Sequence, residues 1–273
     1  MPPRISPADR RLITAYTEAA LRIERQLRDV SDPKRRDSIK ARIEPILSEL
    51  EAITAQYLRK DLAAQFKRGS QEAVDTLRKM KEFRGDIKES FTQLHKEALQ
   101  VLADGAAKSF GVGIRGVRGE VERMISTATK QQIQAEILAA DASGSKAAVK
   151  DIFEKQGFAS FRSDSRTWNL DHYASMITHT ILAEAHNTGA ATRYAENGVE
   201  FVRIIERETA PDACCKWMRG KIVWLGERRL LNPFHPNCFG SFAPYFGDTS
   251  QAFRSIDDPR IPKEVRKFLA RKS

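Results

Sequence analysis

The stretch that decides the fold class is residues 38–57, SIKARIEPILSELEAITAQY. Its apolar side chains recur in alternating steps of four and three residues, at Ile39, Ile43, Ile46, Leu50, Ile53 and Tyr57. This is the heptad spacing of α-helices that pack side by side. Pro45 lies inside the stripe and predicts a kink, because proline removes a backbone donor. The stretch therefore predicts one long helix of a bundle.

Similar patterns flank this helix on both sides. A first helix begins near Ser6, which can cap it, with Pro7 at the first helical position. Downstream, the four-three spacing recurs at Ile87, Phe91, Leu94, Ala98 and Val101. His95 lies beside Lys96 and Glu97, so we expect it to be solvated. Residues 1–110 are thus predicted to form an antiparallel helical bundle or hairpin.

Four glycines follow, at Gly111, Gly113, Gly116 and Gly119, and they spell G-x-G-x-x-G. A dinucleotide-binding loop of that pattern needs a strand before the glycines, whereas a helix is predicted here. We therefore interpret the glycines as a flexible basic hinge loop. Residues 111–167 are predicted to be a hinge with connecting helices.

The hydrophobic period changes after residue 168. A helix is predicted from Asn169 to about Glu196, closed by Asn197-Gly198. Two β-branched and aromatic runs, 199–205 and 221–225, predict strands joined by a turn. We expect an α+β domain over 168–247 and a basic tail over 248–273. The predicted class is mainly α with a small α+β C-terminal domain.

All three cysteines lie between Asp212 and Cys238, where residues 212–238 read DACCKWMRGKIVWLGERRLLNPFHPNC. Asp212 and Cys215 are separated by two residues, as are His235 and Cys238. Thiolates and an imidazole from two turns suit tetrahedral zinc, and Cys214 could replace Asp212. Four protein ligands would make this zinc knuckle structural. In the alternative interpretation, the cysteines are small buried residues and His235 caps a turn.

The same stretch carries a family resemblance. The run from Asp212 to Val223 is followed by Phe234-His235-Pro236-Asn237-Cys238, and the upstream helix carries Trp168, Leu170, Tyr173, Met176 and Thr180. Together these residues resemble the bacteriophage minor capsid or head-morphogenesis family, the Mu F-like minor head proteins, over about residues 168–246. That family typically shows a paired-cysteine turn, C-x4-G-K-[VI] and H-P-N-C-R. Here Asp212 stands at the first paired cysteine, Phe239 at the arginine, and Gly240 at a position that is usually Cys or His.

The resemblance implies a structural role rather than catalysis. Family members are incorporated in a few copies inside the procapsid, near the portal, and help head assembly, genome packaging or delivery. The implied partners are the portal protein and the major capsid or scaffold protein. The implied location is the virion, at the capsid interior or portal vertex, and the host cytoplasm during assembly.

The net charge of +10 favours polyanionic partners, and double-stranded DNA is the first candidate. The candidate phosphate contacts are Arg115, Arg118, Arg123, Arg266, Lys267, Arg271 and Lys272. Three cysteines, two of them adjacent, do not suit a disulfide framework, which favours a reducing compartment. No apolar run approaches the roughly 18 residues of a membrane span, and no signal peptide is recognisable.

Two other functions remain open. His172, His179 and His186 recur every seven residues on one predicted helix, which raises a toxin-like, metal-dependent nuclease using His179, Glu184 or His235. No His-Glu-x-x-His motif supports it, and a polar helix face explains the spacing more simply. The other alternative is a zinc-stabilised DNA-binding module. We expect a non-enzymatic head protein.

Overall fold

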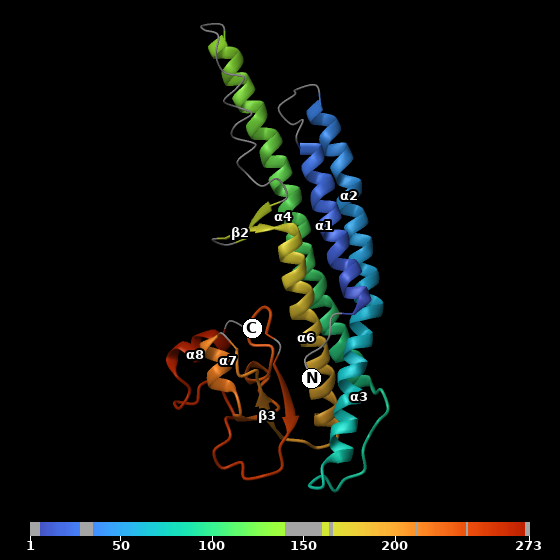
Figure 1. The fold of residues 1–273 in the computed structure, drawn as a ribbon, viewed down its shortest axis with the longest axis vertical. Helices are drawn as coiled ribbons and strands as arrows, with labels where there is room; N and C mark the ends of the chain where they lie inside the picture. Colours follow the sequence, from blue (N-terminus) through green and yellow to red (C-terminus); the bar gives the residue numbers. More distant parts are fainter. Residues whose placement is uncertain are drawn as a thin grey trace. The chain divides into compact units, whose positions relative to one another are not determined.

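The computed structural model describes residues 6–27, 35–139, 160–163, 166–210, 212–238 and 240–270. The chain is mainly helical with a small antiparallel sheet near its C-terminus, which confirms the predicted class (Figure 1). The helices are α1 (Pro7–Leu27), α2 (Arg36–Tyr57), α3 (Ala63–Lys79), α4 (Gln93–Ala139), α6 (Leu170–Glu196), α7 (Ala213–Met218) and α8 (Lys263–Leu269). A π-helical turn, Leu58–Leu62, joins α2 to α3. None of the described helices combines the length and apolar character needed to span a bilayer.

The chain divides into two compact units, each built from separate segments. The hairpin unit comprises Pro7–Tyr57 and Ala107–Ser175, and the sheet unit comprises Leu58–Ala106 and Met176–Ser273 with the N-terminal residues. This grouping differs from the sequential division predicted at residues 110, 167 and 247, because α4 and α6 each contribute to both units.

In the hairpin unit, α1 and α2 lie side by side (Figure 1). The heptad stripe of α2 faces inward: Ile39, Ile43, Ile46, Leu50 and Tyr57 are buried, and Ile53 is half-buried. Two buried hydrogen bonds join the helices, Tyr57 Oη to Asp9 Oδ1 at 2.8 Å and Tyr16 Oη to Thr54 Oγ1 at 2.9 Å. The interpretation of this stretch as a packing helix is confirmed.

The predicted hinge loop at residues 111–119 is wrong, because these residues continue helix α4. Buried apolar residues at helical spacing run through it, namely Phe110, Ile114, Val117, Val121 and Met124. Burial of this stripe outweighs the roughly 1 kcal/mol by which each glycine disfavours a helix. Gly113 has a packing reason, since a Cβ there would lie 2.9 Å from the Tyr173 ring.

The start of α4 also departs from the predicted stripe. Leu94 and Val101 are exposed, at 48% and 61%, whereas their neighbours His95 and Leu102 are buried. The buried face is therefore shifted by one residue from the predicted one. The expectation that His95 is solvated is wrong.

His95 belongs to a buried polar network of the sheet unit. Its Nε2 lies 3.1 Å from Ser70 Oγ, and its Nδ1 lies 3.1 Å from Thr92 Oγ1 and 3.2 Å from Glu196 Oε2. The Phe66 and Phe91 rings pack against the imidazole. Burial, helped by the Arg193 charge, lowers the pKa of His95 below its ordinary 6.5, although Glu196 opposes the shift.

We expect the free energy of unfolding to fall as the pH drops through 6.5. The folded-state pKa of His95 is depressed, so below 6.5 the unfolded chain binds a proton that the folded chain resists. The contribution of His95 to the free energy of unfolding is complete above pH 6.5 and is lost toward lower pH. Denaturant titrations at several pH values should show that the free energy of unfolding changes less with pH in His95→Gln than in the wild type. The matched control is His172→Gln, an exposed position, which should keep the pH dependence of the wild type.

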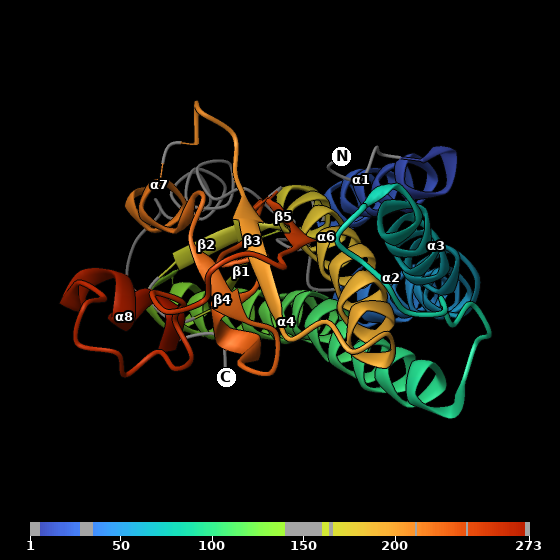
Figure 2. The same cartoon turned by 90° about the horizontal axis from the view of Figure 1, so that it is seen from below.

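The sheet has the order β4-β3-β5, with β3 (Phe201–Ile205) paired antiparallel to β4 (Ile222–Trp224) and β5 (Ser241–Pro244) (Figure 2). The first two strands confirm the predicted ones, and β5 was not predicted. The connection from β3 to β4 contains α7, where only a turn was expected. At the end of α6, Gly198 has φ 73°, as predicted for its cap. A second antiparallel pair, β1 (Ser160–Ser163) and β2 (Arg166–Asn169), precedes α6.

Candidate metal centre

Two chain segments build the Cys/His cluster. Helix α7 buries Cys214, Cys215 and Met218 on its inner face, and Asp212 occupies its N-cap position. The second segment follows the 3₁₀ turn Arg228–Leu230, where the H-P-N-C motif forms a tight turn. In that turn the Cys238 N–H donates to the His235 carbonyl at 3.1 Å, and Asn237 adopts a left-handed φ of 59°. The turn presents the side chains of residues 235 and 238 to the same place.

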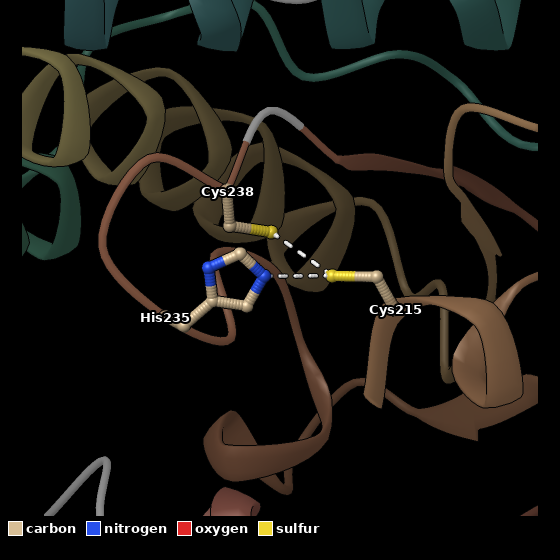
Figure 3. A group of neighbouring side chains, drawn as sticks. All are labelled: Cys215, His235 and Cys238. Carbon is tan, nitrogen blue, oxygen red and sulfur yellow. Dashed lines mark hydrogen bonds between the residues drawn. The ribbon is translucent and has the colours of Figure 1, made fainter. Parts of the chain in front are cut away.

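The side chains of Cys215, His235 and Cys238 point toward one another (Figure 3). The Cys215 Sγ lies 2.9 Å from His235 Nε2 and 3.9 Å from Cys238 Sγ. In a tetrahedral site with Zn–S bonds of about 2.3 Å, two sulfurs lie about 3.8 Å apart. A sulfur and an imidazole nitrogen would lie about 3.6 Å apart, so binding would move Cys215 and His235 slightly apart. The donor set and its spacing fit zinc.

The other two predicted ligands, Asp212 and Cys214, occupy different positions relative to the cluster. Asp212 Oδ2 lies 3.2 Å from His235 Nε2, with 41% of the Asp212 side chain exposed. Cys214 is buried on α7 but is not in the group of ligand atoms within 4.8 Å of one another, which contains Cys215, His235 and Cys238. The structure thus places Asp212 at the edge of the cluster and Cys214 outside it.

Glu206, directly after β3, was missed by the sequence analysis. Its Oε1 accepts a hydrogen bond from Asn232 Nδ2 at 2.5 Å and lies 3.4 Å from Cys238 Sγ. Burial, together with the negative charge of Cys238, raises the pKa of Glu206 to about 7. No spacing motif links residue 206 to the cysteines, because strand pairing brings it to the cluster.

The pKa values of the Cys215 and Cys238 thiols are shifted in opposite directions. A hydrogen bond from Cys215 lowers the pKa of Cys238 to about 5, with further help from the backbone N–H groups of Phe234 and Gly240. The same interaction, with burial, raises the pKa of Cys215. The lowered pKa of Cys238 favours the thiolate, which is the form of cysteine that binds a metal.

Three of the seven predicted phosphate contacts, Arg118, Arg123 and Arg266, are engaged with other groups of the chain. Arg118 forms a two-point ion pair with Glu44, at 2.7 and 3.2 Å, and Arg123 pairs with Glu120. Arg266 donates to the Asp258 and Ile261 carbonyls. The remaining described residues, Arg115 and Lys267, are exposed, and Arg271 and Lys272 lie outside the described residues.

The residues of the nuclease alternative are not assembled into one site. Glu184 pairs with Arg228 at 2.8 Å, and the buried His186 pairs with Glu72 at 3.0 Å. His235 belongs to the cysteine cluster. Within the part of the chain that the structure describes, the His, Cys, Asp and Glu side chains form no second group with metal-ligand spacing.

Comparison with known families identifies the chain. The family model described as phage minor capsid protein 2 matches residues 37–234, well over half of the chain. The match includes Glu206, Asp212 and Cys215 and ends one residue before His235. Searches of curated proteins and of solved structures returned no match. The chain therefore belongs to the phage minor capsid protein 2 family, as its resemblance to minor head proteins predicts.

Proposed function

We propose that this minor capsid protein works at the portal vertex, on the inside of the head, as an assembly component. The family match carries the proposal, because it makes the chain a structural component of a phage head. A role in assembly needs surfaces that bind other virion proteins and requires no catalytic group.

One such surface lies on the sheet unit, at the start of α4. Leu94 and Val101, seven residues apart on this helix, are exposed, and Ala98 lies between them. Leu94 also lines an open groove together with Ala191, Leu225, Leu231 and Phe242. Their seven-residue spacing is typical of helix packing, and the described residues of the sheet unit leave both side chains exposed. These two features support docking of an apolar segment of the portal or capsid protein.

Contact with packaged double-stranded DNA is part of this proposal. The net charge of +10 supports it, because phosphate binding is driven by release of counterions from the nucleic acid. Arg115 and Lys267 are exposed and are the first candidates for such contacts. Arg118 and Arg123 would first have to leave their carboxylate partners.

Incorporation into procapsids tests the proposal. The full chain is co-expressed with the portal, scaffold and major capsid genes of its own phage or prophage, and procapsids are purified and analysed by quantitative mass spectrometry. We expect Leu94→Asp together with Val101→Asp to reduce incorporation at least tenfold, because charges on the docking face oppose burial.

The matched control is Leu21→Asp on α1, where the leucine is also 48% exposed. It should be incorporated like the wild type, and circular dichroism should show that all the variants are folded. Equal incorporation of the double variant would reject this docking face. Absence of the wild-type chain from procapsids would reject the head-assembly role itself.

A further inference from the structure

The thiol and imidazole cluster leaves one position of a tetrahedron to be filled. Cys215, His235 and Cys238 supply three ligand atoms within 4.8 Å of one another. The His235 Nδ1–H donates to the Pro236 carbonyl at 2.7 Å, which leaves Nε2 with its lone pair toward the cysteines. A backbone carbonyl on the far ring nitrogen is the usual second contact of a zinc-binding histidine.

Two carboxylates compete for the fourth position, and their surroundings differ. Asp212 lies 3.2 Å from His235 Nε2, and its side chain is 41% exposed. Glu206 lies beside the buried Cys238 sulfur, at 3.4 Å. The buried Asn232 donates to Glu206 Oε1 and so fixes the direction of the carboxylate. Neither carboxylate belongs to the group of ligand atoms within 4.8 Å of one another, so either would move toward a bound ion. The oriented, half-buried Glu206 beside the Cys238 sulfur is the better-placed ligand.

Gly240 gives independent support for Glu206. A Cβ built at residue 240 would lie 2.1 Å from Glu206 Oε1 and 2.1 Å from Asn232 Nδ2. The space that a side chain at residue 240 would enter is thus filled by the Glu206 carboxylate and the amide that holds it. The carboxylate reaches this space from the residue that directly follows β3.

We propose that Cys215, His235, Cys238 and Glu206 form a closed zinc site, in which Glu206 supplies the fourth ligand. Four protein ligands leave no open position for a substrate, so the site is structural. The ion would link three segments of the sheet unit: the residue after β3, helix α7 and the 235–238 turn. This site does not depend on where in the head the protein works.

Zinc binding by the purified full-length chain is the test. Chromophoric chelator competition should give one zinc per chain, and X-ray absorption should show two sulfur, one nitrogen and one oxygen ligands. We expect Glu206→Gln to weaken zinc binding at least tenfold, because a neutral amide replaces an anionic ligand of the ion. Asp212→Asn should change the affinity less than threefold.

The two adjacent cysteines provide a second matched pair. Cys215→Ser should abolish stoichiometric binding, whereas Cys214→Ser should retain it. If Glu206→Gln fails to fold, Asp212→Ala decides, since an unchanged affinity and an oxygen ligand retained in its absorption spectrum remove Asp212 as the source and leave Glu206 as the carboxylate beside the cluster. Loss of zinc in Asp212→Asn with retention in Glu206→Gln would overturn the assignment. No zinc bound by the wild-type chain would overturn the site.

Discussion

Replacing Gly189 with alanine should lower the free energy of unfolding by about 3 kcal/mol or more. Helices α3 and α6 of the sheet unit touch backbone to backbone at two glycines. A Cβ at Gly189 would lie 2.0 Å from the Phe66 carbonyl oxygen, and a Cβ at Gly69 would lie 1.9 Å from the His186 carbonyl oxygen. Backbone atoms cannot rotate away as a side chain can, so the two helices would have to separate and lose contacts around the buried Phe66.

The direction of the effect makes this experiment decisive. In an open helix position, glycine to alanine stabilises by about 1 kcal/mol, because alanine has the higher helix propensity. Gly105→Ala on α4 is the matched control, since a Cβ there would meet nothing within 4 Å. Urea titrations followed by circular dichroism should therefore shift in opposite directions for Gly189→Ala and Gly105→Ala. A stabilised Gly189→Ala protein would show that α3 and α6 are not in contact at this crossing.

These glycines also mark a limit of sequence analysis. The heptad stripe from Ile39 to Tyr57 was recognisable because its partners recur at a fixed spacing along the chain. The packing role of Gly69 or Gly189 depends on a helix that is more than 100 residues away in the sequence. At residues 111–119 the glycines favoured a loop, yet the apolar stripe through Ile114, Val117 and Val121 kept the helix intact. The glycine content suggested a flexible loop at these residues, whereas burial of the apolar stripe keeps them helical.

The candidate metal centre could likewise be predicted only in part from the sequence. The two-residue gap between His235 and Cys238 identified a turn that makes both side chains available at one point, and the structure brings Cys215 to the same point while Asp212 lies at its edge. The choice between Asp212 and Cys214 as a further ligand depends on the rotation of α7, which the sequence does not define. Glu206 reaches the cluster through the pairing of β3 with its neighbours, so no local spacing could have identified it.

A second large effect is expected at Arg193 on α6. This arginine is 3% exposed and lies beneath the segment that joins α3 to α4. Its guanidinium donates to the carbonyls of Lys88 (2.8 Å), Glu89 (2.9 Å) and Ser90 (3.0 Å), to Ser70 Oγ (3.0 Å) and to Glu196 Oε2 (3.2 Å). One side chain thus donates to three consecutive backbone carbonyls, of which only that of Lys88 has a second side-chain donor among the described residues, Asn197 Nδ2 at 3.3 Å.

Arg193→Lys should therefore lower the free energy of unfolding by about 3 kcal/mol although the charge is kept. An ammonium group offers three donors from a single point, so it cannot reach carbonyls on both sides of a planar fork. Stability is measured by urea titration. Release of the segment is measured by limited trypsin digestion, because Lys81, Arg84 and Lys88 lie within it.

Arg228→Lys is the matched control, because it makes the same exchange at an exposed arginine. Arg228 forms an ion pair with Glu184 while its side chain remains 58% exposed, so the exchange should change stability by no more than about 0.5 kcal/mol. If Arg193 holds the segment in place, Arg193→Lys accelerates cleavage at residues 81–88 under conditions in which the protein stays folded. Loss of stability with unchanged cleavage would mean that Arg193 supports only the buried Ser70, His95 and Glu196 network. Wild-type stability and cleavage together would mean that water can replace the guanidinium at all three carbonyls.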